Sequence, residues 1–322
     1  MKRLVVAGAV WLAACGLPGD GFAQNYPNRT VRIVVPFAPG GGVDVLARLV
    51  GTKLSELTRQ PVVVDHRPGA GGNLGADVVA KSPPDGYTIL LAVSGLAVSP
   101  SLYRTLPFDP VRDLVPVTEV VASTLLLVVT PKLPVTSVQE LIALAKSKPG
   151  TLNYGSSGLG SPLHLSMEIF KSSAGVDLVH VPFRGDAPIN AALIAGNIEL
   201  AFVPQLTGLP LIQSGQLRAL GSTGLKRAAA LPDVPTMAEA GVRGLETSSW
   251  NGMFVPAGTP PEIVAAIQRE VGRVLATEVG ERIRAIGNEP IGSTPEEFAV
   301  KFKADVARFA KAVEDAKIPK LD

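Results

Sequence analysis

The chain has 322 residues, of which 46% are hydrophobic and 18% charged, and its formal net charge is +2. A chain of this length and apolar content can bury one large core or two medium ones. Its scattered basic residues give no indication of a nucleic-acid partner. An aromatic content of 5% is too low for a base- or sugar-stacking surface.

The N-terminal segment has the pattern of an export signal. The basic MKR precedes the apolar run LVVAGAVWLAACGL, which is too short to span a membrane, and small residues up to Ala23 offer a cleavage site. We therefore expect a signal peptide over residues 1–23. A second interpretation stays open, because LAAC is similar to a lipobox in which Cys15, the only cysteine, would carry a lipid anchor.

Strand-like and helix-like segments alternate after this signal. Strands are expected at 31–37, 61–67 and 87–93, helices at 44–57 and, after a glycine loop, within 69–82, and a loop at 94–103. This β-α-β-α-β order predicts a parallel α/β sheet with right-handed crossovers.

The pattern begins again after a long apolar run. Residues 114–131 predict two strands, and we expect the chain to pass there into a second domain. Residues 151–175 are expected to form a strand, a glycine–serine loop and a helix. Further strands are expected at 177–183, 198–204, 217–223 and within 245–260, and helices at 185–197, 209–216, 260–277 and 294–316. The last helix has Thr294 as its expected N-cap.

The loop VVPFAPGGGVD at 34–44 leads from a strand into a helix, a place where proteins hold anions. It is not a P-loop, because no Lys with Ser or Thr follows the glycines. It is not a dinucleotide loop either, because Val45 stands where the third glycine is required. Asp44 is expected to cap the helix and to brace the loop.

A matching loop, NYGSSGLGSPLH, lies at 153–164. Its serines do not form a nucleophile elbow, since Leu159 stands where glycine is required, and no histidine spacing indicates a catalytic triad. No metal-ligand motif is present either, so we expect no metal and no cofactor. Two such loops facing each other would direct two helix N-termini into one cleft, an arrangement that suits a carboxylate.

Five segments resemble the solute-binding receptors of tripartite tricarboxylate transporters, the TctC-like or Bug receptors. They lie at 26–48, 67–91, 153–170, 181–185 and 234–260. The resemblance implies an α/β protein with the type II periplasmic-binding-protein fold, in which two lobes and a hinge enclose an interdomain ligand cleft. We expect lobe 1 to comprise residues 24–124 plus 250–322, and lobe 2 to comprise residues 125–249.

The resemblance also implies a function. The chain is expected to be a periplasmic receptor, not an enzyme, that captures a small carboxylate for a membrane permease of one large and one small subunit. We expect a monomer. A sensory receptor that presents its ligand to a two-component system is the alternative, and an exported hydrolase is the less favoured one.

Both lobes supply the ligand-binding residues that the resemblance implies. These are Phe37, Ala38, Gly40 and Gly41, then Ser94 and Ala97, then Ser156, Ser157 and Gly160, and finally Phe183 and Gly185. Two places depart from the family. Pro204 and Gln205 stand where many relatives have an Asp that contacts the far end of the ligand, and Asn251 stands where a large aromatic residue is common. We therefore expect an anionic ligand without a free amine.

Overall fold

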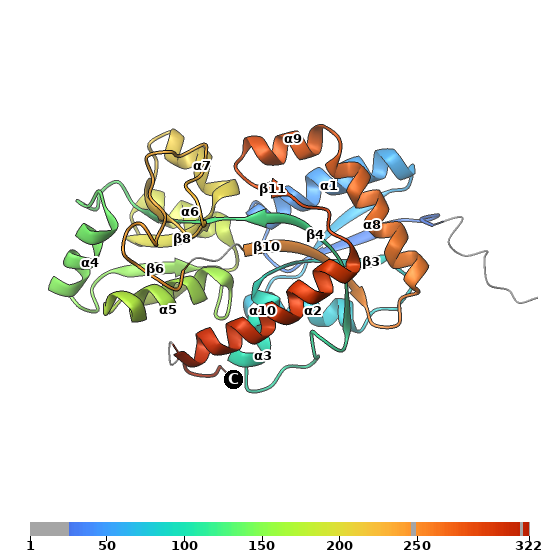
Figure 1. The fold of residues 1–322 in the computed structure, drawn as a ribbon, viewed down its shortest axis with the longest axis horizontal. Coiled ribbons are helices and arrows are strands. Elements are labelled where there is room, and N and C mark those ends of the chain that lie inside the picture. Colours follow the sequence, from blue (N-terminus) through green and yellow to red (C-terminus); the bar gives the residue numbers. More distant parts are fainter. Residues whose placement is uncertain (1–25, 246–248, 316–317, 322) are drawn as a thin grey trace, which may run out of the picture.

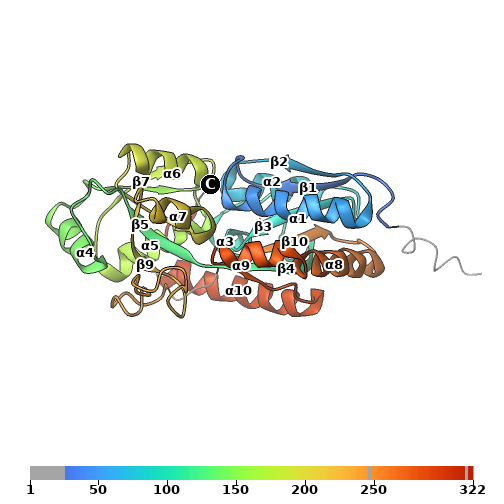
Figure 2. The ribbon, with the colours of Figure 1, turned by 90° about the horizontal axis from the view of Figure 1, so that it is seen from above.

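The computed structural model describes residues 26–245, 249–315 and 318–321. Two α/β units lie side by side along the long axis of the molecule (Figure 1, Figure 2). The expected signal peptide over 1–23 and the candidate lipidation site Cys15 lie outside the described residues. None of the described helices is long and apolar enough to cross a membrane.

Within the described residues, the first unit is built on a six-stranded sheet in the order β11-β4-β10-β3-β1-β2. Its strands are β1 (Val31–Val35), β2 (Val62–His66), β3 (Thr88–Val93), β4 (Leu114–Ser123), β10 (Ser249–Pro256) and β11 (Glu289–Pro290). β1, β2 and β3 are parallel, as their order in the sequence predicts. β10 runs antiparallel to both β3 and β4, and β11 runs antiparallel to β4, so the sheet as a whole is mixed.

Helices cover both faces of this sheet. One face carries α1 (Gly42–Thr58), α8 (Pro261–Leu275) and α9 (Glu278–Ala285); the other carries α2 (Asn73–Ala80), α3 (Gly95–Leu102) and α10 (Pro295–Asp315). A short 3₁₀ turn, Ala70–Gly72, precedes α2. Each face of the sheet packs with its helices into an apolar core. Successive residues of β1 point to opposite faces, so Ile33 lies in the core beneath α1, α8 and α9, and Val34 lies in the core beneath α2, α3 and α10.

The segment 94–103 is a helix and not the loop that its Ser, Gly and Pro content suggests. Leu96 and Leu102 of α3 are buried, and α3 packs against the C-terminal helix α10. This contact joins segments that are far apart in the sequence. Local composition therefore does not reveal helix α3, because tertiary packing overrides the weak helix propensity of this segment.

The second unit has its own sheet, in the order β7-β6-β8-β5-β9. Its strands are β5 (Leu125–Val129), β6 (Asn153–Ser156), β7 (Val179–Pro182), β8 (Leu200–Pro204) and β9 (Arg218–Ser222). Its helices are α4 (Val138–Ser147), α5 (Pro162–Ala174), α6 (Asp186–Ala195) and α7 (Gln205–Gln213), and α7 begins earlier than expected. One apolar core, drawn from residues 125–245, holds this unit together.

The first connection between the units is short. β4 ends at Ser123 and β5 begins at Leu125, so Thr124 alone separates a strand of one sheet from a strand of the other. The chain returns to the first sheet in β10, which begins at Ser249. This grouping of strands supports the proposed lobe limits of 24–124 with 250–322 and of 125–249, which stay a proposal.

Candidate functional site

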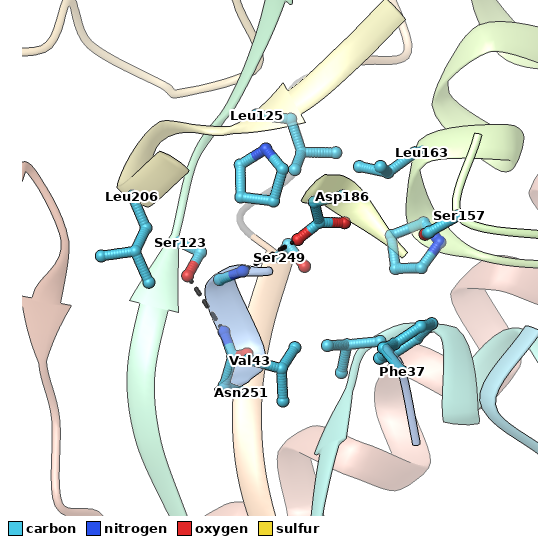
Figure 3. A pocket seen from close by; sticks show the side chains of 14 residues that line it. Phe37, Val43, Ser123, Leu125, Ser157, Leu163, Asp186, Leu206, Ser249 and Asn251 are labelled. Atoms are coloured by element: carbon cyan, nitrogen blue, oxygen red, sulfur yellow. Dashed lines mark hydrogen bonds between the residues drawn. The ribbon is translucent and has the colours of Figure 1, made fainter. Parts of the chain in front are cut away.

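A cavity lies between the two units, at the carboxyl ends of several strands. The empty space in the cavity and at its mouth is about 470 Å³, open solvent included. Its wall is formed by Phe37, Gly42, Val43, Val93, Ser123, Leu125, Ser157, Pro162, Leu163, Asp186, Pro204, Leu206, Ser249 and Asn251 (Figure 3). Helices α1, α5, α6 and α7 all begin at this wall, so the positive ends of four helix dipoles lie around it.

The first loop runs from the end of β1 to the start of α1 and is braced by Asp44. Asp44 Oδ2 accepts a hydrogen bond from the N–H of Gly40 at 2.9 Å. Its Oδ1 lies 2.9 Å from Arg48 Nε and 2.8 Å from His66 Nε2. Burial alone would raise the pKa of Asp44, but these three partners hold it below its usual value. Asp44 thus braces the loop, but it does not cap α1 as expected, because the N-cap is Gly41, which has no side chain to bond the first N–H groups.

The second loop, between β6 and α5, uses its three serines differently. Ser156 is buried, and its Oγ lies 2.6 Å from His180 Nε2. Ser161 caps α5 by accepting a hydrogen bond from the N–H of His164 at 3.3 Å. Ser157 is the serine of this loop that lines the cavity.

His180 is held in its neutral form beside this loop. Burial, reinforced by the neighbouring His164 ring, lowers the pKa of His180 to about 4. A neutral imidazole accepts or donates one hydrogen bond at each nitrogen. The bond to Ser156 therefore fixes the loop, and it turns the Ser156 hydroxyl toward His180.

The loop before α1 meets a third loop, the one before α6, across the boundary between the units. The N–H of Ala38 donates to the carbonyl of Arg184 at 2.9 Å, and the N–H of Gly42 donates to Asp186 Oδ2 at 3.1 Å. The loop between β6 and α5 is also joined across the boundary, because the Tyr103 hydroxyl of the first unit donates to the carbonyl of Leu159 at 2.9 Å. These contacts close the cavity around its rim.

Asp186 is the one charged residue among the described residues that line the cavity. It is the first residue of α6 and is only 8% exposed. Burial raises the pKa of Asp186 to about 6, and the hydrogen bond from Gly42 opposes that shift. Sequence reasoning missed this residue. The available signal was an acid at the start of a helix that directly follows a strand, in VPFRGDAP.

The residues predicted for the site fall into several groups. Phe37, Ser157 and Pro204 line the cavity. Ala38, Gly40, Gly41 and Gly185 lie at the contact between the loops, where added side-chain atoms at the glycines would approach Ala38, Asp186 or Ala187. Phe183 lines a side pocket together with Phe37 and Ser157.

Other predicted residues lie away from the cavity. Ala97 is fully buried in the core of the first unit, and Gly160 packs against Leu102 and Tyr103. Ser94 reaches the cavity only indirectly, because its Oγ lies 2.9 Å from Oγ of Ser249, which does line it. Gln205 lines a separate hollow together with Asn288, and no partner is found for its side-chain amide among the described residues.

Two polar residues of the cavity wall come from the strands that connect the units. Asn251 of β10 donates from Nδ2 to Oγ of Ser123, at the end of β4, at 3.1 Å. Figure 3 draws this bond beside the cavity. Asn251 thus takes part in the wall, although the sequence marked it only as a departure from the family. No group of His, Cys, Asp or Glu side chains in the described part of the chain could hold a metal ion.

Two α/β units that close on a cavity at the ends of their strands define a two-lobed solute-binding receptor. Residues 46–308 match the model of the tripartite tricarboxylate transporter family receptor, TctC. The chain belongs to this family, whose members include the Bug receptors, and it is a receptor and not an enzyme.

Named relatives agree with this assignment. Protein BugT of Bordetella pertussis is 36% identical over 318 residues, which cover 98% of each chain. The structure of R. palustris Rpa4515 with adipate has a TM-score of 0.88 and 42% identity, covering 92% of this chain and 100% of the other. MatC from Rhodopseudomonas palustris with bound malate has a TM-score of 0.86 and 31% identity, covering 89% and 100%. The expected periplasmic-binding-protein fold is therefore confirmed.

Proposed function

We propose that this protein captures a small organic anion, a carboxylate, outside the cytoplasm and delivers it to a tripartite tricarboxylate-type transporter. The observation that carries the proposal is the cavity between the two units, rimmed by helix N-termini and closed by hydrogen bonds between the loops that precede α1 and α6. Two similar structures hold dicarboxylates, adipate and malate, which supports the same ligand class here.

The wall of the cavity suits a carboxylate on a short carbon skeleton. Backbone N–H groups at helix N-termini and the hydroxyls of Ser157 and Ser249 can bind carboxylate oxygens. Phe37, Val93 and Leu163 offer apolar surface for the carbon chain. The site needs no Arg or Lys in direct contact with the anion.

The contributions of individual residues are part of this proposal. Phe37, Ser157, Pro204, Ser249 and Asn251 would contact the ligand. The backbone around Ala38, Gly40, Gly41 and Gly185 would join the two lobes over it. Ser94, Ser156 and Gly160 would act by shaping these loops, because their side chains or backbones bond to other loop residues or pack within the units.

The partner and the location are proposed together. A permease of one large and one small membrane subunit would receive the ligand from a monomeric receptor. Export by a signal peptide over residues 1–23 would place the receptor in the periplasm, either soluble or held by a lipid on Cys15. A mobility shift that depends on signal peptidase II would distinguish the lipid-anchored form.

A thermal-shift screen tests the ligand class. The protein is first unfolded and refolded to remove any ligand acquired during expression, and is then melted with mono-, di- and tricarboxylates of two to eight carbons. A ligand at 100 times its Kd stabilises the folded state by about 2.7 kcal/mol. The matched methyl esters are the control, and we expect them to have no effect. Stabilisation by the esters, or by none of the carboxylates, contradicts the proposal.

A further inference from the structure

Asp186 places a carboxylate inside a cavity that is otherwise suited to an anion. Its Oδ2 accepts one hydrogen bond, from the N–H of Gly42 at 3.1 Å. The residue is 8% exposed, and Figure 3 shows it among the residues of the cavity wall, between Leu163 and Ser249. A buried carboxylate with a single neutral donor leaves much of its hydrogen-bonding capacity unused.

No cationic side chain among the described residues that line the cavity compensates this charge. The charged groups on the elements packed against Asp186 are Asp44, Arg48, Lys53 and Glu56 of α1, and Arg184 in the loop before α6. Lys53 pairs with Glu56 and Glu278. Asp44 and Arg48 bind each other at 2.9 Å, and Arg184 is exposed. Because a buried charge is costly unless it is well paired, the ionised form of Asp186 calls for a donor in addition to the N–H of Gly42.

A ligand carboxylate in the same cavity increases the need for a group that compensates the charge of Asp186. Two carboxylates at close range cannot both stay ionised without a compensating group. The missing group is either a proton or a hydrogen-bond donor carried by the ligand itself. An ammonium or hydroxyl substituent on the carbon skeleton would donate to Asp186 while the ligand carboxylate binds the helix N-termini.

We propose that Asp186 is the specificity-determining residue of the cavity and that it selects carboxylates bearing an ammonium or hydroxyl group over unsubstituted carboxylates. This inference rests on the proposed function. It also replaces the expectation of a ligand without an amine. That expectation depended on the absence of an acid at 203–205, and α6 supplies an acid from a different element.

Protonation gives the proposal a measurable signature. Burial raises the pKa of Asp186 to about 6, so the group is mostly ionised at pH 7.5. An unsubstituted dicarboxylate must then take up about one proton on binding, and its affinity should fall by about tenfold per pH unit above pH 6. A ligand that donates to the ionised carboxylate takes up no proton, and its affinity should rise by no more than about twofold between pH 6 and 8.

Isothermal titration calorimetry with matched ligands tests the inference. Succinate, malate and aspartate share one four-carbon skeleton: succinate carries no donor, malate carries a hydroxyl and aspartate carries an ammonium group. Adipate, 2-hydroxyadipate and 2-aminoadipate form the same series on a longer skeleton. Titrations at pH 7.5 in two buffers of different ionisation enthalpy give both Kd and proton uptake. For the wild-type protein we expect a donor-bearing member to bind at least tenfold tighter than its unsubstituted partner, with proton uptake only for the latter.

The variant Asp186→Asn keeps the shape of the side chain and an acceptor for Gly42, but removes the charge. We expect its preference between matched ligands to fall below threefold and its proton uptake to disappear. Asp177→Asn, at an exposed carboxylate before β7, makes the same charge change on the surface and should leave both quantities unchanged. The proton-uptake measurement on the wild-type protein stands even if the Asp186 variant does not fold.

The outcomes separate this inference from the proposed function. If carboxylates bind without preference for a donor, or if Asp186→Asn weakens all matched ligands equally, Asp186 only joins the loops and the inference fails while the receptor function stands. Retained preference in Asp186→Asn also overturns the inference. If no carboxylate binds at any pH, both proposals fail.

Discussion

Three serines within six residues of one loop have three different surroundings. Ser156 bonds to His180, Ser157 lines the cavity, and Ser161 caps α5. The hydroxyl chemistry is the same in each case, so the direction of each side chain decides its role. That direction follows from the turn between β6 and α5, in which Gly158 and Gly160 adopt positive φ angles of 117° and 77°.

Ser157 and Ser161 should therefore separate binding from stability. We expect Ser157→Ala to weaken carboxylate binding by about three- to tenfold, since a hydrogen bond contributes about 0.5–1.5 kcal/mol, with little change in the free energy of unfolding. Ser161→Ala removes an N-cap and should lower the free energy of unfolding by about 0.5–2 kcal/mol. Calorimetric titration and urea unfolding of both variants give the two quantities. The reverse pattern would show that Ser161, and not Ser157, faces the ligand.

The sequence predicts the loops of the site better than it predicts the side chains that fill it. The strand-loop-helix pattern places Phe37 and Ser157 near the cleft, because each lies within a few residues of a strand end. Ser249 and Asn251 could not be assigned in this way. Their positions depend on how two units pack against each other and on the antiparallel strand β10, and neither is encoded in local periodicity.

At the scale of elements, the C-terminal helix α10 anchors the first sheet. Phe298 and Phe302 are buried and pack edge-on against Trp250 of β10, at ring-centroid distances of 5.2 and 6.0 Å. Trp250 Nε1 also donates to Asp305 of α10 at 2.8 Å. Gly252 leaves room for this packing, because a Cβ at that position would collide with the ring of Phe298. Helix α10 therefore holds the strand that carries Ser249 and Asn251.

Removing this aromatic contact should lower the stability of the whole protein. We expect Phe302→Ala to lower the free energy of unfolding by about 3–5 kcal/mol, as for other large aromatic residues removed from a core. Val300, two residues earlier on the same helix, is 72% exposed. Val300→Ala should change stability by less than about 0.5 kcal/mol. Urea unfolding followed by tryptophan fluorescence measures both, and a loss below 1 kcal/mol for Phe302→Ala would contradict this role for α10.

The elements themselves were largely predictable, although helices α4 and α9 were not among those expected. Short apolar runs rich in β-branched residues indicate β1, β2 and β3, and apolar residues at helical spacing indicate the helix after β1. Helix α3 was mistaken for a loop since it depends on contact with α10. The antiparallel placement of β10 and β11 was not anticipated, because pairing between strands distant in sequence leaves no local pattern.

At the scale of the whole molecule, the two units approach each other closely at Gly71. Its φ is +63°, and a Cβ at this position would collide with the carbonyl oxygen of Leu159 in the other unit. The hydroxyl of Tyr103 donates to the same carbonyl. Closure of the cavity thus requires that residue 71 have no side chain.

Gly71→Ala should impair closure without unfolding either unit. We expect carboxylate affinity to fall by at least tenfold, or about 1.4 kcal/mol, and the radius of gyration with ligand to stay at its ligand-free value in small-angle X-ray scattering. Gly175→Ala is the matched control, because Gly175 also has a φ of +63° but no atom within 4 Å of an added Cβ. It should lose stability by about 1 kcal/mol and keep its affinity. Equal affinities in the two variants would mean that binding does not need this contact.

The position of β10 also has a consequence for the order in which the nascent chain folds. The strands β5 to β9 all lie within residues 125–222, so the second sheet can form as soon as that stretch has been synthesised. The first sheet has to wait, because β10, which separates β3 from β4, begins only at Ser249. The middle of the chain should therefore fold before its beginning. The N-terminal third remains an unfinished sheet until the last quarter of the protein has been made.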